Sequence, residues 1–530
     1  MKKRRIIKSI FASMLAIIMV LSLTSIVSAA DTATLTINNT VAGKTVDLYQ
    51  VFSAAKNATT NAVSYTLKTE YENFFKSDNK YGCINLEDST ALSEAAYKYV
   101  AKLSDDAKVE FAKEILKWSL DPINTVSRYN NDDINTTETS TQILVQNYGF
   151  YLVYLKGASD ITTSITDVKE YSPAILVNVT DPNVDINMKS SYPTVDKKID
   201  NKDYGEAAIG DEIKYTLTSN VPDMTGYSSY TFKFKDILSP GLTFNSDSVT
   251  LSIDNTNITN ETDVGEKYSV NNITGDDGKT TVTIELKDFI SYANQVGKRI
   301  VVTYTATLNE NALVGTDANN NSAVIEYSND PSDSSSTEDS TPDIVPVYSF
   351  DILIHKFYID SGGNKQSLAG AGFKLYYDSN CTQELKLIKS TTDAGEAVYQ
   401  LNMDTAADSV EAMSPDNGNI QIKGLDANKK YYLKETKTPD KFNSLLGPIE
   451  FEIVPSYDTD GKTLDAYNIH YTYNSHSENT TDNVLNVENK TGEELPDTGG
   501  MGTVIFTVGG LAIIGIMVGF SVMSKKKKKM

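Results

Sequence analysis

The chain has 530 residues, of which 40% are hydrophobic, and its formal net charge is −22 at pH 7. So acidic a surface repels nucleic acid and anionic membranes, so neither is an expected partner. The sequence contains only two cysteines, Cys83 and Cys381, which excludes an extensive disulfide framework.

The N-terminus has the pattern of an export signal. Basic residues between Lys2 and Lys8 precede an apolar run from Ile10 to Leu23, and small residues follow up to Ala30. This order is typical of a secretory signal peptide, so we assign 1–30 to it and expect cleavage after Ala30.

Residues 31–189 form the first segment of the exported chain, an N-terminal domain. Apolar and polar residues alternate as in strands at 33–37, 46–52, 149–154 and 174–179. Residues 105–120 instead place apolar side chains at helical spacing. We therefore expect a β-sandwich with helical insertions.

Residues 190–330 form the second segment, in which almost no helix is predicted. Its strand patterns fall at 212–219, 230–234, 279–286, 300–308 and 323–327. Short strands separated by turn residues predict an immunoglobulin-like sandwich. A stretch rich in Ser, Asp, Thr and Pro follows, which predicts a linker over 331–347.

Residues 348–491 form the third segment, with strand patterns at 350–356, 373–377, 430–434 and 484–489. The predicted fold class is therefore mainly β, with tandem immunoglobulin-like β-sandwich domains.

The C-terminal segment, 492–530, combines three features in a fixed order. A five-residue motif comes first, formed by Leu495, Pro496, Asp497, Thr498 and Gly499. An uncharged stretch over 501–523 follows, and as a helix it would be about 35 Å long, enough to cross a bilayer. Five lysines close the chain and predict a cytoplasmic end. Removing the leader and the part after Thr498 takes away ten positive charges and no negative ones, and changes the −22 of the whole chain to −32.

This tail resembles the cell-wall sorting signal that sortases recognise on Gram-positive bacteria. The resemblance implies that a sortase cysteine attacks the Thr498 carbonyl and releases the part that begins with Gly499. An amine, from a wall precursor or from a lysine of another subunit, then takes the acyl group.

The second and third segments each have a lysine in their first strand and an asparagine in their last. These residues are Lys197 and Asn321 in the second segment, and Lys356 and Asn489 in the third. Because apolar residues lie two positions from Lys197 on both sides, the period of a strand predicts that its side chain points inward. Burying a lysine without a partner is costly, so each lysine needs one.

Across nearly its full length the chain resembles the sortase-assembled backbone pilins of Gram-positive bacteria. In that family such a lysine and asparagine join as an intramolecular isopeptide bond, with help from a buried acid. The resemblance implies a CnaA-like second segment, where 234–242 matches the strand with the catalytic aspartate and points to Asp236. It implies a CnaB-type third segment, where 431–439 matches the E-box and points to Glu435.

An apolar core suits this chemistry. It lowers the pKa of the lysine, so that the amine is a neutral nucleophile, and raises the pKa of the carboxyl group. A protonated carboxyl then polarises the asparagine carbonyl, and ammonia leaves. The reaction happens once in each domain, so we do not expect a turnover enzyme.

The amine that joins one subunit to the next is also implied by the resemblance. The family's motif commonly contains Tyr-Pro-Lys, but here Tyr192 and Pro193 precede Thr194, so the tripeptide is broken. The better match is 185–189, which points to Lys189 as the acceptor for Thr498, with Lys198 as the alternative.

The resemblance therefore implies a major pilus shaft subunit on the cell surface that supports adhesion. Its implied partners are identical subunits in a head-to-tail polymer, a pilin sortase, a housekeeping sortase, minor pilins and peptidoglycan, and a host surface ligand is left open. The alternative is a monomeric wall-anchored adhesin without a functional acceptor lysine. No cofactor or metal is expected, because the three histidines form no recognisable metal or triad spacing.

Overall fold

The computed structural model describes residues 32–130, 132–158, 174–188, 191–260, 266–391, 397–404, 406, 408–480 and 483–491. The chain divides into two compact units. Unit 1 comprises Met1–Gly205, Glu212–Thr307 and Asn319–Pro346, and unit 2 comprises Glu206–Asp211, Leu308–Ala318 and Val347–Met530. The division into three domains inferred from the sequence stays a prediction. The signal peptide, Lys189 and the C-terminal segment lie outside the described residues.

Unit 1 begins with a sandwich of two sheets. The smaller sheet has the order β5-β1-β8, and the larger has the order β3-β2-β6-β7 with β4 beside β2. The strands are β1 (Ala33–Thr40), β2 (Thr45–Lys56), β3 (Val63–Leu67), β4 (Ile134–Asn135), β5 (Thr139–Val145), β6 (Gly149–Leu155), β7 (Ala174–Val179) and β8 (Asn183–Asn187). One apolar core, including Leu35, Leu48 and Val153, fills the space between the sheets.

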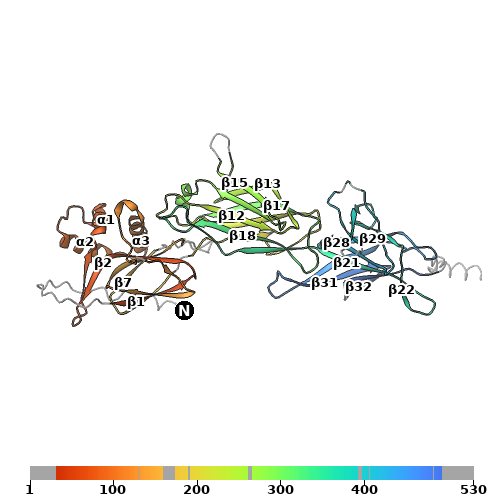
Figure 1. Cartoon of the computed structure of the whole chain (residues 1–530), viewed down its shortest axis with the longest axis horizontal. Coiled ribbons are helices and arrows are strands. Elements are labelled where there is room, and N and C mark those ends of the chain that lie inside the picture. The colour runs from red at the N-terminus through yellow and green to blue at the C-terminus, as the bar shows by residue number, and fades with distance from the viewer. Residues whose placement is uncertain are drawn as a thin grey trace, which may run out of the picture. The chain divides into compact units, whose positions relative to one another are not determined.

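Helices cover the other face of the larger sheet, as Figure 1 shows. They are α1 (Glu72–Lys76), α2 (Ser89–Ala101) and α3 (Asp105–Leu120). The side chain of Ser104 caps α3 by accepting a hydrogen bond from the Ala107 amide, which otherwise has no partner in the first turn. A second core rich in aromatic rings, including Phe52, Phe75 and Phe111, joins the helices to the sheet. The predicted sandwich with helical insertions is therefore confirmed, and α2 was not anticipated.

The second sandwich of unit 1 contains both halves of one predicted Lys/Asn pair. One sheet has the order β14-β13-β17-β11-β9, and the facing sheet has the order β10-β20-β18-β12-β16-β15 with β19 beside β18. The first sheet is formed by β9 (Asp196–Ile199), β11 (Glu212–Asn220), β13 (Leu242–Ile253), β14 (Thr256–Ile258) and β17 (Arg299–Leu308). The second is formed by β10 (Gly205–Glu206), β12 (Phe232–Leu238), β15 (Tyr268–Thr274), β16 (Thr280–Leu286), β18 (Asn319–Ser328), β19 (Thr337–Asp339) and β20 (Asp343–Tyr348).

Much of the stretch predicted as a linker is folded. β19 pairs with the end of β18, and Asp330 accepts a hydrogen bond from Lys156 of the first sandwich at 2.9 Å. The composition misleads here because Asp and Ser also build short turns. Asp330 and Asp333 each accept the backbone N–H two residues on, at 2.9 Å in both cases. This stretch is therefore not a free connector.

Unit 2 holds the third sandwich. One sheet has the order β22-β21-β28-β26-β25 with β33 beside β21, and the other has the order β24-β23-β29-β30-β31-β32 with β27 beside β23. The first is formed by β21 (Phe350–Ile359), β22 (Lys365–Ser367), β25 (Leu387–Thr391), β26 (Ala397–Leu401), β28 (Asn419–Leu425) and β33 (Val484–Glu488). The second is formed by β23 (Gly372–Tyr376), β24 (Glu384–Leu385), β27 (Ala412–Met413), β29 (Lys430–Lys437), β30 (Ile449–Tyr457), β31 (Leu464–Tyr473) and β32 (His476–Asn479). The mainly β fold class is confirmed.

Within the described ranges, no helix is both long enough and apolar enough to cross a bilayer. The predicted membrane-spanning stretch over 501–523 lies outside those ranges.

Candidate functional site

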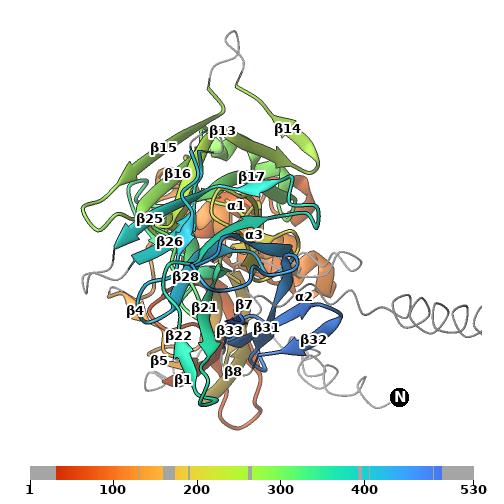
Figure 2. The ribbon, with the colours of Figure 1, turned by 90° about the vertical axis from the view of Figure 1, so that its right-hand side faces the viewer.

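The strand pairing of unit 2 brings its predicted lysine and asparagine together. Lys356 lies on β21, which pairs in parallel with β33 so that Lys356 is opposite Val487, and Asn489 follows at the end of β33. Figure 2 shows β33 beside β21. Glu435 comes from β29 in the facing sheet. The apolar alternation of β21 points Lys356 inward, because Ile352 and Ile354 share its face.

Lys356, Glu435 and Asn489 form a compact buried group, which we call the unit 2 cluster. Lys356 Nζ donates a hydrogen bond to Asn489 Oδ1 and lies 3.8 Å from Glu435 Oε1. Asn489 Nδ2 donates to the same Glu435 oxygen at 2.8 Å. The side chains of Lys356 and Glu435 are 0% and 1% exposed. One carboxylate oxygen therefore faces both the amine and the amide nitrogen.

The surroundings of the unit 2 cluster favour a neutral amine. Burial lowers the pKa of Lys356 to about 8, although the charges of Glu435 and Glu488 act in the opposite direction. The second oxygen of Glu435 accepts hydrogen bonds from the Leu445 amide at 3.0 Å and the Thr438 hydroxyl at 3.1 Å. These bonds fix the carboxylate, so its first oxygen stays directed at the other two residues.

Unit 1 contains a second buried group, which we call the unit 1 cluster, formed by Lys197, Asp236, Tyr304 and Asn321. Lys197 and Tyr304 come from the sheet of β9 and β17, whereas Asp236 and Asn321 come from β12 and β18 in the facing sheet. All four residues are at most 1% exposed. Lys197 and Asn321 therefore come from facing sheets, whereas Lys356 lies on β21 and Asn489 directly follows the neighbouring strand β33.

Hydrogen bonds in the unit 1 cluster converge on Tyr304. Lys197 Nζ lies 2.5 Å from Asp236 Oδ2 and donates to the Tyr304 hydroxyl at 3.1 Å. Asn321 Nδ2 donates to the same hydroxyl at 2.6 Å, and the hydroxyl itself donates to Asp236 Oδ2. Burial lowers the pKa of Lys197 against the opposing effect of Asp236, and burial raises the pKa of Tyr304.

The structure thus brings together all six residues predicted for internal cross-linking, in two groups. Their chemical roles remain predictions. The alternative acceptor, Lys198, is partly exposed and forms ion pairs with Asp196 and Asp203. Lys189 and the motif of residues 495–499, with Thr498, lie outside the described residues.

Sequence reasoning missed Tyr304, although a signal for it existed. On β17, Tyr304 shares its inward face with Ile300, Val302 and Ala306. A tyrosine at an inward strand position needs a partner for its hydroxyl, because buried tyrosines are normally hydrogen-bonded. That need identifies Tyr304 as part of a polar group in the core.

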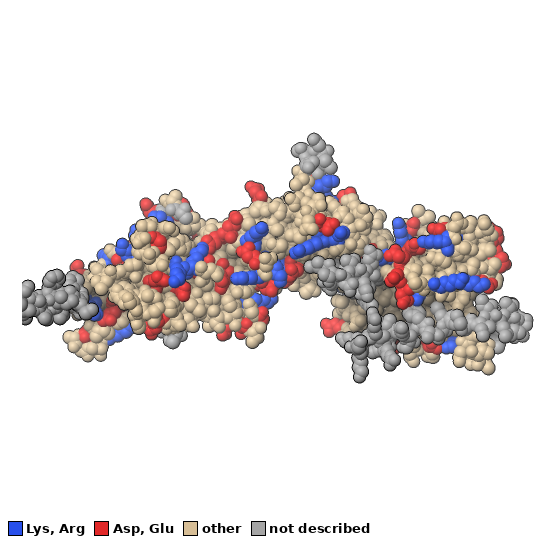
Figure 3. Space-filling model, turned by 180° about the vertical axis from the view of Figure 1, so that it is seen from behind, with Lys and Arg blue, Asp and Glu red and all other residues tan. Residues whose placement is uncertain are grey.

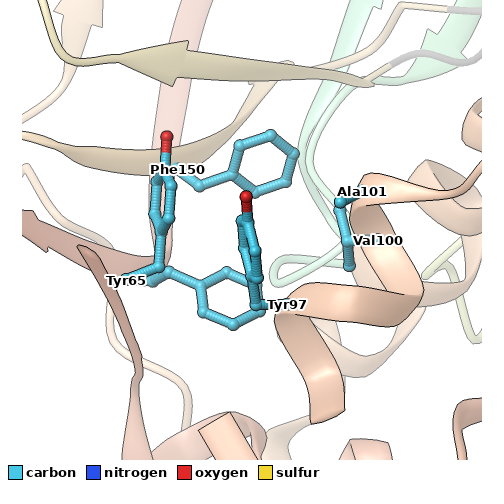
Figure 4. A pocket seen from close by; sticks show the side chains of 6 residues that line it. Tyr65, Tyr97, Val100, Ala101 and Phe150 are labelled. Carbon is cyan, nitrogen blue, oxygen red and sulfur yellow. The ribbon is translucent and has the colours of Figure 1, made fainter. Parts of the chain in front are cut away.

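Two other features of the described surface lie apart from these clusters. An aromatic pocket in the first sandwich is lined by Phe52, Tyr65, Tyr97, Val100, Ala101 and Phe150. Figure 4 shows the rings of Tyr65 and Tyr97 side by side, and they stack with centroids 5.1 Å apart. On the face in Figure 3, acidic and basic side chains are interspersed.

Two protein families match the chain. A prealbumin-like fold domain named SpaA matches 354–468, the range that contains Lys356 and Glu435. The LPXTG cell wall anchor motif matches 487–529, which contains Asn489 and the predicted motif at 495–499. The chain is therefore a wall-anchored surface protein with a prealbumin-like domain.

One streptococcal protein is similar to the chain in sequence, and solved streptococcal and corynebacterial structures match it. The trypsin-resistant surface T6 protein of Streptococcus pyogenes serotype M6 is 26% identical over 357 residues, which cover 61% of this chain and 60% of that protein. The solved T6 backbone pilin is 16% identical with a TM-score of 0.47, and the match covers 88% of this chain and 99% of that one. The Corynebacterium diphtheriae major pilin SpaA is 13% identical with a TM-score of 0.44, and the match covers 87% of this chain and 100% of that one. The chain is homologous to the T6 protein, and the resemblance to Gram-positive backbone pilins is confirmed.

The lowered pKa of Lys356 predicts how fast the unit 2 cluster reacts at different pH values. The predicted reaction needs a neutral Lys356 amine and one proton on Glu435, so the rate of ammonia loss should fall as the pH rises through about 8 and the pair loses that proton. Exported chain carrying Lys197→Ala, recovered unfolded and refolded at a series of pH values, isolates this reaction for intact mass spectrometry. A rate that keeps rising over this range would contradict a reaction that depends on the proton shared by Lys356 and Glu435.

Proposed function

We propose that this protein is the major structural subunit of a covalently polymerised surface pilus, and that it is not a turnover enzyme. The observation that carries the proposal is the buried unit 2 cluster, in which an amine, an amide and a carboxylate meet within 3.8 Å. The wall anchor motif and the homology to the T6 protein support a surface role.

In the proposed internal reaction, neutral Lys356 Nζ attacks Cγ of Asn489. Protonated Glu435 donates a hydrogen bond to the amide, gives its proton to the leaving nitrogen and takes one from the attacking nitrogen. The Nζ–Cγ bond forms, the Cγ–Nδ2 bond breaks and one ammonia leaves. Lys197 and Asn321 react in the same way in unit 1, with Asp236 as the acid.

In the proposed assembly, a pilin sortase cleaves after Thr498 and joins its carbonyl to Lys189 of the next subunit. The chain on both sides of Lys189 is anchored, which suits an attachment point under tension. Met188 is buried, and its amide donates to the Asn38 carbonyl at 3.0 Å, while Tyr192 packs over Lys44 with 4.3 Å between Nζ and the ring centre. A housekeeping sortase then attaches the polymer to peptidoglycan, and minor pilins complete it.

Intact mass spectrometry of the exported chain, 31–498, tests the internal bonds. The mass should be lower than that of the unmodified sequence by two ammonia molecules. Glu435→Ala should restore one of them, because it removes the acid of the unit 2 cluster and leaves the unit 1 cluster intact. Glu452→Ala on the adjacent strand β30 is the matched control and should keep both bonds. An unmodified mass for the parent chain would contradict the proposed internal bonds.

Denaturing gels of wall extracts test polymerisation. The parent chain should give a ladder of covalent multimers, and Lys189→Arg should abolish it because arginine is a much poorer nucleophile. Lys198→Arg is the control and should leave the ladder unchanged. A ladder that survives Lys189→Arg but not Lys198→Arg would move the joint to Lys198. A single monomer band from the parent chain would favour a monomeric wall-anchored adhesin.

A further inference from the structure

The two clusters differ in how far their acids reach. In unit 2, Glu435 Oε1 lies 3.8 Å from the lysine nitrogen and 2.8 Å from the asparagine nitrogen. In unit 1, Asp236 Oδ2 lies 2.5 Å from Lys197 Nζ, but Asn321 Nδ2 donates to Tyr304 and not to the acid. Aspartate is one methylene shorter than glutamate, and the tyrosine hydroxyl occupies the space between the acid and the amide.

The position of the Tyr304 hydroxyl is fixed by packing. The ring stacks on Tyr215, opposite it on β11, with centroids 5.2 Å apart, and meets Phe244 edge-on at 5.4 Å. A phenol both donates and accepts, and this one accepts from Lys197 and Asn321 and donates to Asp236. It thus contacts both nitrogens that change bonding in the proposed reaction.

We propose that Tyr304 is a catalytic residue of the unit 1 cross-link, passing a proton from Asp236 to the departing nitrogen of Asn321. This inference rests on the proposed function, because it concerns the reaction that joins Lys197 to Asn321. Glu435 needs no such relay in unit 2, since that carboxylate already accepts a hydrogen bond from the departing nitrogen of Asn489.

Lys197 transfers a proton to Asp236, and its neutral Nζ attacks Cγ of Asn321. Tyr304 gives its proton to Nδ2 and regains one from Asp236, while the attacking nitrogen returns a proton to the Asp236 carboxylate. The Nζ–Cγ bond forms, the Cγ–Nδ2 bond breaks, and ammonia leaves. Asp236 ends protonated and Tyr304 ends unchanged, so no further reactant is needed.

Time-resolved intact mass spectrometry of the refolding exported chain tests the relay. The parent chain should lose two ammonia molecules, whereas Tyr304→Phe should lose one at the normal rate and the second at least about 100-fold more slowly, the usual effect of removing an acid–base group. Tyr230→Phe, which removes another buried tyrosine hydroxyl from the same sandwich, is the control and should lose both normally. The first ammonia loss, from the unit 2 cluster of the same chain, serves as the internal reference rate.

Two outcomes distinguish a failure of the Tyr304 relay from a failure of the proposed internal bonds. If Tyr304→Phe loses the second ammonia at the parental rate, Tyr304 is not catalytic. If the parent chain loses none, the proposed internal bonds fail, and the relay with them.

A second measurement covers the case in which Tyr304→Phe does not fold. A fluorinated tyrosine at position 304 keeps the ring and the hydroxyl but lowers the pKa of the phenol. The rate of the second ammonia loss should then change and shift its dependence on pH, whereas the first loss should not. Unchanged kinetics at this position would overturn the relay, because a hydroxyl that only fills space is insensitive to its acidity.

Discussion

The burial of a lysine amine in an apolar sandwich is the constraint on which the two clusters depend. Lys197 and Lys356 are both fully buried, and an unpaired charge at either position would cost several kcal/mol. Each lysine is therefore met by a carboxylate and an amide from other strands. Asp236 Oδ1 is itself buried without a hydrogen-bond partner among the described residues, which adds to the cost of the unreacted cluster. Forming a neutral amide replaces a buried ionisable amine by a group that the core accommodates easily, so the proposed reaction relieves a cost that the fold creates.

The two proposed bonds would join different parts of their sandwiches. A bond between Lys197 and Asn321 would join facing sheets across the core of the second sandwich, whereas one between Lys356 and Asn489 would join the neighbouring strands β21 and β33. Lys356 and Asn489 are 133 residues apart in the sequence. A covalent bond that closes so long a loop stabilises the fold by about 5 kcal/mol, by analogy with a disulfide. In the proposed polymer, tension between Lys189 and Thr498 passes through both bonds. The folded stretch around β19 leaves less extensible chain between them than its linker-like composition suggests.

Strand periodicity was enough to predict that Lys197 points inward, and the helix 105–120 was predicted at its observed bounds. α2 was missed although Leu92, Ala96 and Val100 recur at helical spacing, so its signal was present in the sequence. Other features depend on information that composition and periodicity do not contain. The alternation of residues along β17 shows that the Tyr304 side chain points inward. Its partners come from β12 and β18, and only the pairing and packing of the sheets bring them within reach. The same limit explains why the two clusters looked alike in the sequence and differ in geometry.

Peptide mapping of the mature protein by tandem mass spectrometry tests most directly whether these buried clusters react to form covalent bonds. We expect one branched peptide that contains both Lys197 and Asn321, and another that contains both Lys356 and Asn489. Each should be lighter by one ammonia than its two linear components together. Recovery of linear peptides with an unmodified lysine and asparagine at these positions would contradict it.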